Sequence, residues 1–246
     1  YVAWNWKANG SGSSNTNGDI TSTVSANVDA GFSIVTYTGT ATAGTVGHGL
    51  NSAPDIVIVK RRNATGYWNV NAKNLGLSDA TMTLYLNTTN AGGSGSTHWN
   101  NTAPDATKFT ITSYTSVNAN TSPLVAYCFH SVDGYSKVGT YEGNSSTDGA
   151  FVYTGFRPAF VMIKASSHGG HWVISNNKST PYNVVNKGII ANASAGEYTD
   201  PNLACLIDYT SNGFKWRNSD DNNNYTGRTY IYIAFAETPF KYSNAR

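Results

Sequence analysis

The strongest constraint on the fold of this chain is that its sequence repeats itself. Strand-like segments and glycines recur in the same order in both halves, and eight residues separate Lys60 from Trp68, as they do Lys164 from Trp172. The matched segments are 31–35 with 134–138, 36–39 with 140–143, 55–60 with 159–164, and 124–129 with 230–235. Chance is a poor explanation for so many ordered matches, so the chain contains two copies of one unit of about 100 residues.

The repeat sets the expected domain boundaries. We predict a first β-sandwich repeat at residues 31–132 and a second at residues 133–246. The segment Tyr1–Trp6 reads like the closing strand 124–129, so we interpret it as an orphan strand left from an earlier copy in a longer polypeptide. The alternative is that it completes the sheet of the first domain. Residues 10–30 are rich in Gly, Ser, Asn and Thr and are predicted to be a polar linker.

The pattern within each unit is that of β-strands. Phe32 and Ile34 alternate with Ser33 and Val35, the period of two that a strand shows. Turn signals such as Asn212-Gly213 recur at the spacing of an antiparallel sandwich. We therefore predict an all-β fold of two tandem antiparallel β-sandwich domains, jelly-roll-like, from an internal duplication and preceded by the orphan strand. The one helical turn expected is Lys73 to Leu77.

The composition narrows the class of partner. Charged residues make up 12 % of the chain, about half the roughly 25 % of an average soluble domain, and the net charge is +2. A nucleic-acid binder shows a basic stripe, whereas the densest basic cluster here, Lys60-Arg61-Arg62, ends an apolar strand and is interpreted as a solvated strand end. No apolar run is long enough to span a bilayer. We expect neither nucleic-acid binding nor membrane insertion.

No catalytic or metal-binding constellation stands out. His168-Gly-Gly-His171 lacks a third ligand nearby and is interpreted as a hairpin turn. The run 220–224 resembles the start of a calcium loop but lacks its glycine and distal glutamate. Paired carboxylates of the glycosidase type stay open as an alternative, with only three glutamates to supply them. We expect no enzyme activity, no metal and no cofactor.

Aromatic residues carry the binding hypothesis. An aromatic face packs on the C–H face of a sugar while Asn and Thr side chains bind its hydroxyls. Trp99 and His98 lie in a polar stretch with no counterpart in the second unit, and Tyr67 and Tyr225 lie beside turns. These four residues are the predicted carbohydrate-binding residues, with Trp99 and His98 first. A loop aromatic packed onto its own sheet is the equal alternative.

Several phrases of the sequence resemble a group of structural proteins of marine bacteriophages. They span nearly the whole chain: Tyr1–Lys7, Ala30–Gly39, Thr45–Leu50, Val125–Phe129, Phe151–Phe160 and Pro239–Arg246. The resemblance implies a virion component of the tail-fibre or receptor-binding type, in which this region closes a longer polypeptide. It implies no catalytic or ligand residues.

The sequence and the resemblance together predict a bacteriophage virion protein that attaches to a host cell-surface glycan or protein. Other virion proteins are the further expected partners, and a homo-oligomer, such as a trimer, is the expected assembly. Two alternatives stay open: a capsid decoration or tail scaffold with no receptor role, and a fragment of a surface-polysaccharide depolymerase.

Overall fold

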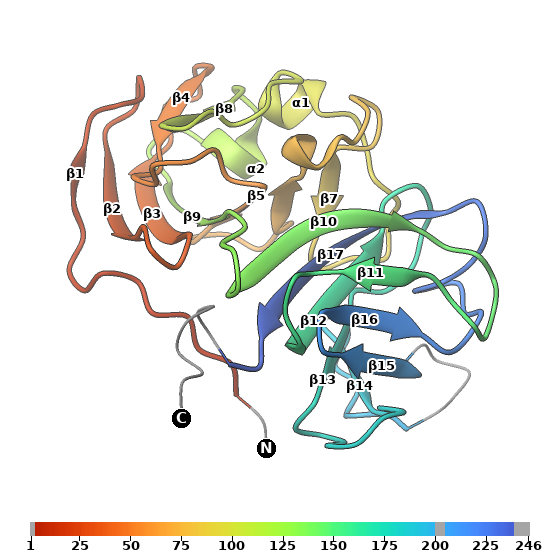
Figure 1. Ribbon diagram of the computed structural model, residues 1–246. Helices are drawn as coiled ribbons and strands as arrows, with labels where there is room; N and C mark the ends of the chain where they lie inside the picture. The colour runs from red at the N-terminus through yellow and green to blue at the C-terminus, as the bar shows by residue number, and fades with distance from the viewer. Residues whose placement is uncertain (1–2, 200–204, 239–246) are drawn as a thin grey trace. The chain divides into compact units, whose positions relative to one another are not determined.

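The fold is described from a computed structural model of the chain (Figure 1). The structure describes residues 3–199 and 205–238. These residues form two compact units. The N-terminal unit comprises Trp4–Leu86 and Gly92–Ser131, and the C-terminal unit comprises the other described residues.

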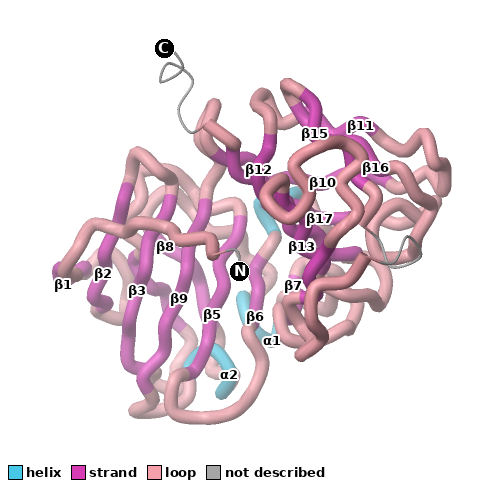
Figure 2. Tube along the Cα trace, turned by 90° about the horizontal axis from the view of Figure 1, so that it is seen from below, coloured by secondary structure: helices cyan, strands magenta, loops and turns pink. Residues whose placement is uncertain are grey.

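A seven-stranded antiparallel sheet is the main element of the N-terminal unit, in the order β1-β2-β3-β9-β5-β6-β7 (Figure 2). A two-stranded sheet, β4-β8, accompanies it, with a 3-10 turn at Lys73–Leu75 and two short helices. The bounds are β1 Ser13–Asn15, β2 Ser22–Asn27, β3 Phe32–Thr38, β4 Gly44–Gly47, β5 Ile56–Arg61, β6 Asn69–Asn71, β7 Thr83–Tyr85, α1 Ser96–Trp99, β8 Lys108–Ile111, α2 Thr115–Asn118 and β9 Pro123–Phe129.

The C-terminal unit has a five-stranded antiparallel sheet, β10-β17-β12-β13-β14, and a three-stranded sheet, β11-β16-β15. The bounds are β10 Ser136–Glu142, β11 Phe151–Tyr153, β12 Pro158–Ala165, β13 Val173–Asn176, β14 Gly188–Ile190, β15 Ile207–Thr210, β16 Gly213–Trp216 and β17 Thr229–Ala236. Its core is aromatic: Tyr141 and Tyr230 stack with ring centroids 5.1 Å apart, and Phe214 and Trp216 are fully buried beside them.

The two units share one strand order. The sequence β3-β9-β5-β6-β7 in the first matches β10-β17-β12-β13-β14 in the second, and the β4-β8 pair matches β11-β16. The central strands β5 and β12 are buried on both faces, as their continuous apolar runs predict. The predicted all-β fold with antiparallel sheets is therefore confirmed. Apart from residues 3 and 87–91, which belong to the C-terminal unit, the boundary between the two units lies after Ser131.

The structure differs from the interpretation of the N-terminal segment at the residues that it describes. Residues 3–6 form no strand, and Tyr1 and Val2 lie outside the described residues. The predicted linker instead contains β1 and β2, which extend the large sheet beyond β3. Ser22 and Val24 are only 2 % and 6 % exposed because they lie on the core side of β2, while Thr23 between them faces solvent. This alternation could not be recognised in the sequence, because the residues of these edge strands are mostly small and polar.

Candidate functional site

Four aromatic rings form a connected cluster in the N-terminal unit. Tyr67 packs on Tyr85 with ring centroids 4.6 Å apart, Tyr85 lies 5.9 Å from His98, and His98 lies 4.7 Å from Tyr114. We call these four residues the aromatic cluster. Tyr67 is 43 % and Tyr114 41 % exposed, whereas His98 is 4 % exposed. The cluster is therefore anchored by a buried imidazole and presents a tyrosine to solvent at each end.

The backbone brings these rings together from four segments. Tyr67 lies in the loop between β5 and β6, Tyr85 ends β7, His98 lies on α1, and Tyr114 immediately precedes α2. Asn69, which is fully buried, joins the Tyr67 loop to α2, because its side-chain amide donates to the carbonyls of Tyr67 and Ser116, both at 3.3 Å. The Ser116 hydroxyl donates to the Asn69 side-chain oxygen at 3.1 Å.

A pocket of about 190 Å³ lies beside Tyr67. We call it the Tyr67 pocket; its lining residues are Lys60, Arg61, Thr65, Gly66, Tyr67, Thr115 and Ser116. It offers one aromatic wall, three hydroxyl groups and a guanidinium, and no carboxylate lines it. An aromatic wall with convergent hydroxyls and donors suits a small polar ligand that carries both C–H faces and hydroxyl groups.

The two basic side chains of this pocket have different roles. The Lys60 ammonium donates to the carbonyls of Arg61 and Ala64, both at 2.7 Å, so it holds the loop that carries Tyr67. Arg61 donates from Nε to the Asn63 side-chain oxygen at 2.8 Å, which leaves the other guanidinium N–H groups available to a ligand. Lys60 is a structural residue here, and Arg61 is the cationic group that a ligand meets.

Burial governs the chemistry of His98. Neither ring nitrogen has a hydrogen-bond partner among the described residues. Desolvation in this apolar setting lowers the pKa of His98 to about 4. The imidazole is therefore neutral at physiological pH and acts as a packing group between Tyr85 and Tyr114.

The prediction that Trp99 and His98 form an open glycan platform was wrong. Trp99 is fully buried and His98 nearly so, because α1 turns both side chains inward, where the two rings lie 6.0 Å apart. The alternative, a loop aromatic packed onto its own unit, is what the structure shows. Tyr67 is the predicted residue that lines the pocket.

Tyr225 belongs to the C-terminal unit and is not part of the aromatic cluster. It is 43 % exposed, and the Arg228 guanidinium lies 4.6 Å from its ring centroid. Sequence reasoning did not single out Tyr85, Tyr114, Thr115 or Ser116. The one available signal was Tyr114-Thr115-Ser116, an aromatic residue in a polar stretch like the one that contains Trp99.

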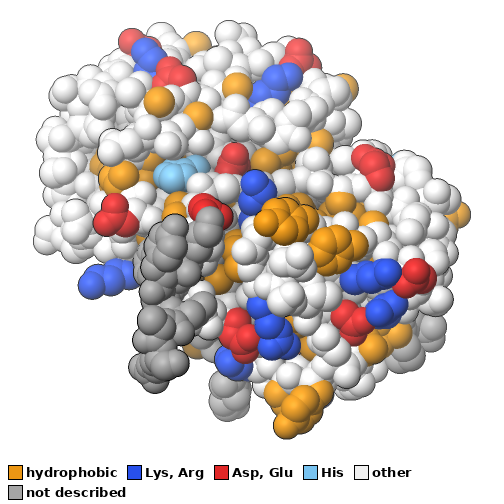
Figure 3. Space-filling model, in the orientation of Figure 1, with side chains coloured by type: hydrophobic (Ala, Val, Ile, Leu, Met, Phe, Trp, Pro, Cys, Tyr) orange, Lys and Arg blue, Asp and Glu red, His pale blue; other side chains and the backbone are white. Residues whose placement is uncertain are grey.

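The C-terminal unit exposes an aromatic pair of its own. Phe151 and Tyr153 on β11 are 48 % and 64 % exposed, and Val152 between them is buried. β11 is an edge strand of its three-stranded sheet. In the view of Figure 3, apolar side chains lie in several small groups among mostly uncharged polar atoms and scattered charges.

A metal-ligand cluster and a membrane-spanning helix are both absent from the part of the chain that the structure describes. Among residues 3–199 and 205–238, no three His, Cys, Asp or Glu side chains are grouped so that they could hold a metal ion. No helix in these ranges is long and apolar enough to cross a membrane.

The fold and the pocket define an all-β, two-unit protein with a polar, aromatic-walled site. The chain belongs to the family described as a domain of unknown function, DUF7483, whose model matches residues 1–239. Comparison with curated proteins gave no match. A comparison with solved structures found the major capsid protein P2 from bacteriophage PM2, at 8 % identity and a TM-score of 0.24, covering 82 % of this chain and 96 % of that chain. A TM-score this low does not show that the two proteins share a fold.

Proposed function

We propose that this chain is a non-enzymatic structural protein of a bacteriophage virion and that its N-terminal unit attaches to a host-surface glycan through the Tyr67 pocket. The observation that carries the attachment role is the geometry of that pocket: an exposed tyrosine, backed by Tyr85, beside the hydroxyls of Thr65, Thr115 and Ser116. The virion location rests on the resemblance of the sequence to phage structural proteins.

The pocket matches what a monosaccharide unit requires. A sugar ring places its C–H face on an aromatic ring and its hydroxyls against short polar side chains. Tyr67 is held in place on one side by Tyr85 and at its carbonyl by Asn69. Such prior ordering lowers the entropy cost of binding. A glycan that repeats along a cell surface would supply avidity from many weak contacts.

The test is a pull-down of the purified chain on intact host cells, with and without excess soluble surface polysaccharide. We expect saturable binding that the polysaccharide competes away. Tyr67→Ala removes the aromatic wall and should weaken binding about tenfold. Tyr225→Ala is the matched control, because Tyr225 is equally exposed but lies in the other unit, and it should bind like the parent. Equal binding by both variants would reject the Tyr67 pocket as the attachment site.

A second function, assembly with other virion proteins, is favoured by one observation. Phe151 and Tyr153 are exposed together on an edge strand, and edge strands with apolar side chains pair readily with other chains. We propose this face as the contact with a second copy or another virion protein. Sedimentation should show self-association or co-assembly that Tyr153→Ser weakens; Tyr182→Ser, at an exposed loop position, is the control. Unchanged sedimentation would reject this role for the face.

A further inference from the structure

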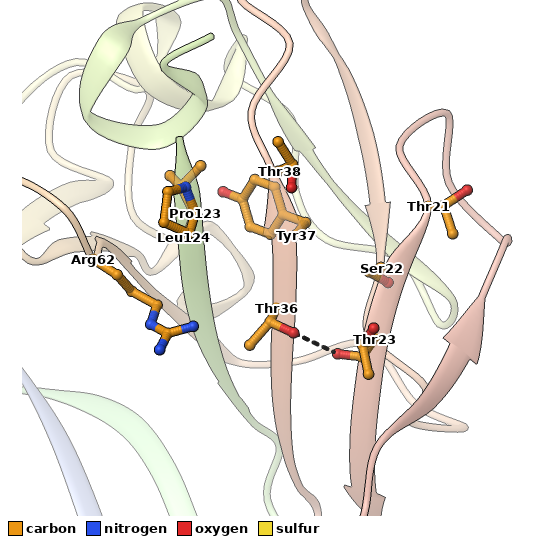
Figure 4. A pocket seen from close by; sticks show the side chains of 9 residues that line it. All are labelled: Thr21, Ser22, Thr23, Thr36, Tyr37, Thr38, Arg62, Pro123 and Leu124. Atoms are coloured by element: carbon orange, nitrogen blue, oxygen red, sulfur yellow. Dashed lines mark hydrogen bonds between the residues drawn. The ribbon is translucent and has the colours of Figure 1, made fainter. Parts of the chain in front are cut away.

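A second pocket of about 270 Å³ lies on the N-terminal unit, at the end of its large sheet (Figure 4). It is lined where β2 begins, β3 ends, β9 begins and β5 ends. Its lining residues are Thr21, Ser22, Thr23, Thr36, Tyr37, Thr38, Arg62, Pro123 and Leu124. We call the set Thr21, Thr23, Thr36, Thr38 and Arg62 the threonine shelf.

The strand period places the shelf on the outer face of the sheet. Ser22, Tyr37 and Leu124 are 2 %, 5 % and 0 % exposed and point into the core. Their neighbours along each strand therefore point outward. Thr23 pairs with Thr36 across β2 and β3. The result is two short rows of threonines side by side on a solvent-facing surface.

The hydroxyl groups of the shelf are available to a ligand. Thr36 donates a long hydrogen bond, 3.4 Å, to the carbonyl of Thr23. Within the described residues, the hydroxyls of Thr21, Thr23 and Thr38 make no hydrogen bond. A threonine hydroxyl donates once and accepts twice, so this surface can meet both the donors and the acceptors of a polar ligand.

Arg62 differs from the other arginines in the described part of the chain. Arg157, Arg217 and Arg228 each contact a carboxylate, at 3.0, 2.6 and 3.2 Å. Arg61 donates to Asn63. Among residues 3–199 and 205–238, the guanidinium of Arg62 has no hydrogen-bond or ion-pair partner, although its backbone N–H is fixed on the Pro123 carbonyl at 2.9 Å. No carboxylate lines the pocket, so its charge is positive and unbalanced.

We propose that the threonine shelf binds an anionic group carried by a sugar, a carboxylate, sulfate or phosphate. The Arg62 guanidinium offers paired N–H donors that match a planar or tetrahedral oxyanion. The threonine rows bind the hydroxyls of the same sugar unit. A neutral sugar can bond to the threonine rows but has no oxyanion for Arg62. The site therefore binds anionic sugars more tightly than neutral ones.

This inference deepens the proposed function and rests on it for the source of the ligand. Arg61 is the last residue of β5, and Arg62 follows it directly along the chain. Arg61 lines the Tyr67 pocket and Arg62 lines the shelf. The two pockets therefore meet at the C-terminal end of β5, which is the arrangement expected for an extended acidic polysaccharide that runs across the ends of the strands.

The test is an NMR titration of the intact chain with single sugars, which needs no knowledge of the host. The probes are D-glucuronate, galactose 6-sulfate and glucose 6-phosphate, with neutral glucose beside them. At millimolar concentrations we expect at least one anionic probe to shift the Arg62 Nε–H signal and the amides of Thr36 and Thr38 saturably. The responding probe identifies which anion the site takes, and glucose should shift these signals far less.

Arg62→Gln should weaken binding of that probe about tenfold, the loss expected for one charge-assisted hydrogen-bonded contact. Lys137→Gln removes one positive charge at an exposed strand position of the other unit and should leave binding unchanged. Shifts confined to the Tyr67 pocket, or no saturable shift at the shelf with any anionic probe, would overturn this proposal. Either result leaves the cell-binding test of the Tyr67 pocket standing, so the two proposals fail separately.

Discussion

Asn118 in the N-terminal unit and Asn224 in the C-terminal unit are fully buried at equivalent positions and share three corresponding hydrogen bonds to the backbone. Each side-chain amide donates to two loop carbonyls: those of Thr42 and Thr112 at 2.8 and 2.9 Å, and those of Ser146 and Asn218 at 2.9 and 2.8 Å. Each side-chain oxygen accepts a backbone N–H, from Thr40 and Asn144 respectively. We call each of these asparagines, together with its hydrogen-bond partners, a polar bracket. The two units therefore share a polar bracket as well as a strand order.

The same bracket includes a tyrosine in each unit. The Tyr37 hydroxyl donates to the carbonyl of Val117 at 2.7 Å, one residue before Asn118. The Tyr141 hydroxyl donates to the carbonyl of Asn223 at 2.5 Å, one residue before Asn224. Both rings are buried in their cores. Each unit thus ties one loop to its core strand through buried polar groups, all of which are satisfied by partners.

Replacing either bracket asparagine should destabilise the protein strongly. Asn118→Ala and Asn224→Ala each remove four side-chain hydrogen bonds and leave buried backbone groups unsatisfied, so each should cost about 2–4 kcal/mol of unfolding free energy. Urea unfolding followed by tryptophan fluorescence measures this. Asn120→Ala, at an exposed position, is the control. A loss below about 1 kcal/mol in the bracket variants would contradict the structural role argued for them.

The glycines that face the brackets should tolerate no side chain. A Cβ at Gly39 would lie 2.1 Å from the carbonyl oxygen of Ala119, and one at Gly143 would lie 2.3 Å from that of Tyr225. Because the obstructing atoms are backbone, Gly39→Ala and Gly143→Ala should each lower stability by about 3 kcal/mol. Gly196→Ala, where no atom lies within 4 Å, should change it little. Similar melting temperatures for all three variants would contradict this prediction, because they would show that the loops move to make room for the added methyl group.

His98 should make the N-terminal unit sensitive to acid. Its pKa is lowered to about 4 in the fold, whereas an unfolded histidine titrates near about 6.5. The unfolded chain therefore binds the proton first, so stability is full above the unfolded pKa and falls as the pH drops toward 4. Burial raises the pKa of Tyr85, which faces His98, so this phenol stays neutral in this range. Buried His48, whose pKa is also lowered by desolvation, adds a dependence of the same sign.

The measurement is urea unfolding at neutral pH and near pH 4.5 for the parent chain, His98→Phe and His168→Gln. His98→Phe keeps an aromatic ring but takes up no proton, so its loss of stability on acidification should be smaller than that of the parent. His168 is exposed, and its variant should follow the parent. Equal acid sensitivity in the parent and His98→Phe would show that the buried imidazole does not control this response.

Lys164 should give the C-terminal unit a dependence on alkaline pH. Its ammonium donates to the carbonyls of Ala165 and His168 at 2.9 and 3.3 Å, the same relative positions that Lys60 contacts in the other unit. Burial lowers the pKa of Lys164 to about 8. The unfolded chain keeps this proton to higher pH, so stability should rise between about pH 8 and about pH 10.5. Lys164→Met should flatten that rise, and exposed Lys137→Met should not; parallel curves for both variants would refute the assignment.

The sequence predicts most of the fold because its signals are local and repeated. Alternating residues such as 32–35 and the apolar runs of β5 and β12 indicate strands directly. Segment 13–27 was missed, since its Ser, Thr and Asn residues read as loop until β3 supplies a partner. The bracket asparagine Asn224 was hidden in a run that looks like a polar turn. The strands in 13–27 and the burial of Asn224 both depend on contacts with segments that are distant in the sequence. Local composition does not reveal such contacts.

The site was less accessible to prediction. Tyr67 was found because an aromatic residue beside a turn tends to face solvent. The same reasoning failed at Trp99, because polar neighbours say nothing about which way a short helix turns its side chains. The role of Arg62 could not be predicted either. Only the three-dimensional arrangement shows that its guanidinium has no acidic partner within the described residues.

The most direct test of the account is the affinity of the purified chain for immobilised host-surface polysaccharide, measured in parallel for the parent, Tyr67→Ala and Tyr225→Ala. We predict that Tyr67→Ala weakens binding about tenfold, as loss of an aromatic anchor does, while Tyr225→Ala matches the parent. Equal affinities for all three proteins, or no binding by the parent, would contradict the attachment role and leave assembly through Phe151 and Tyr153 as the function to pursue.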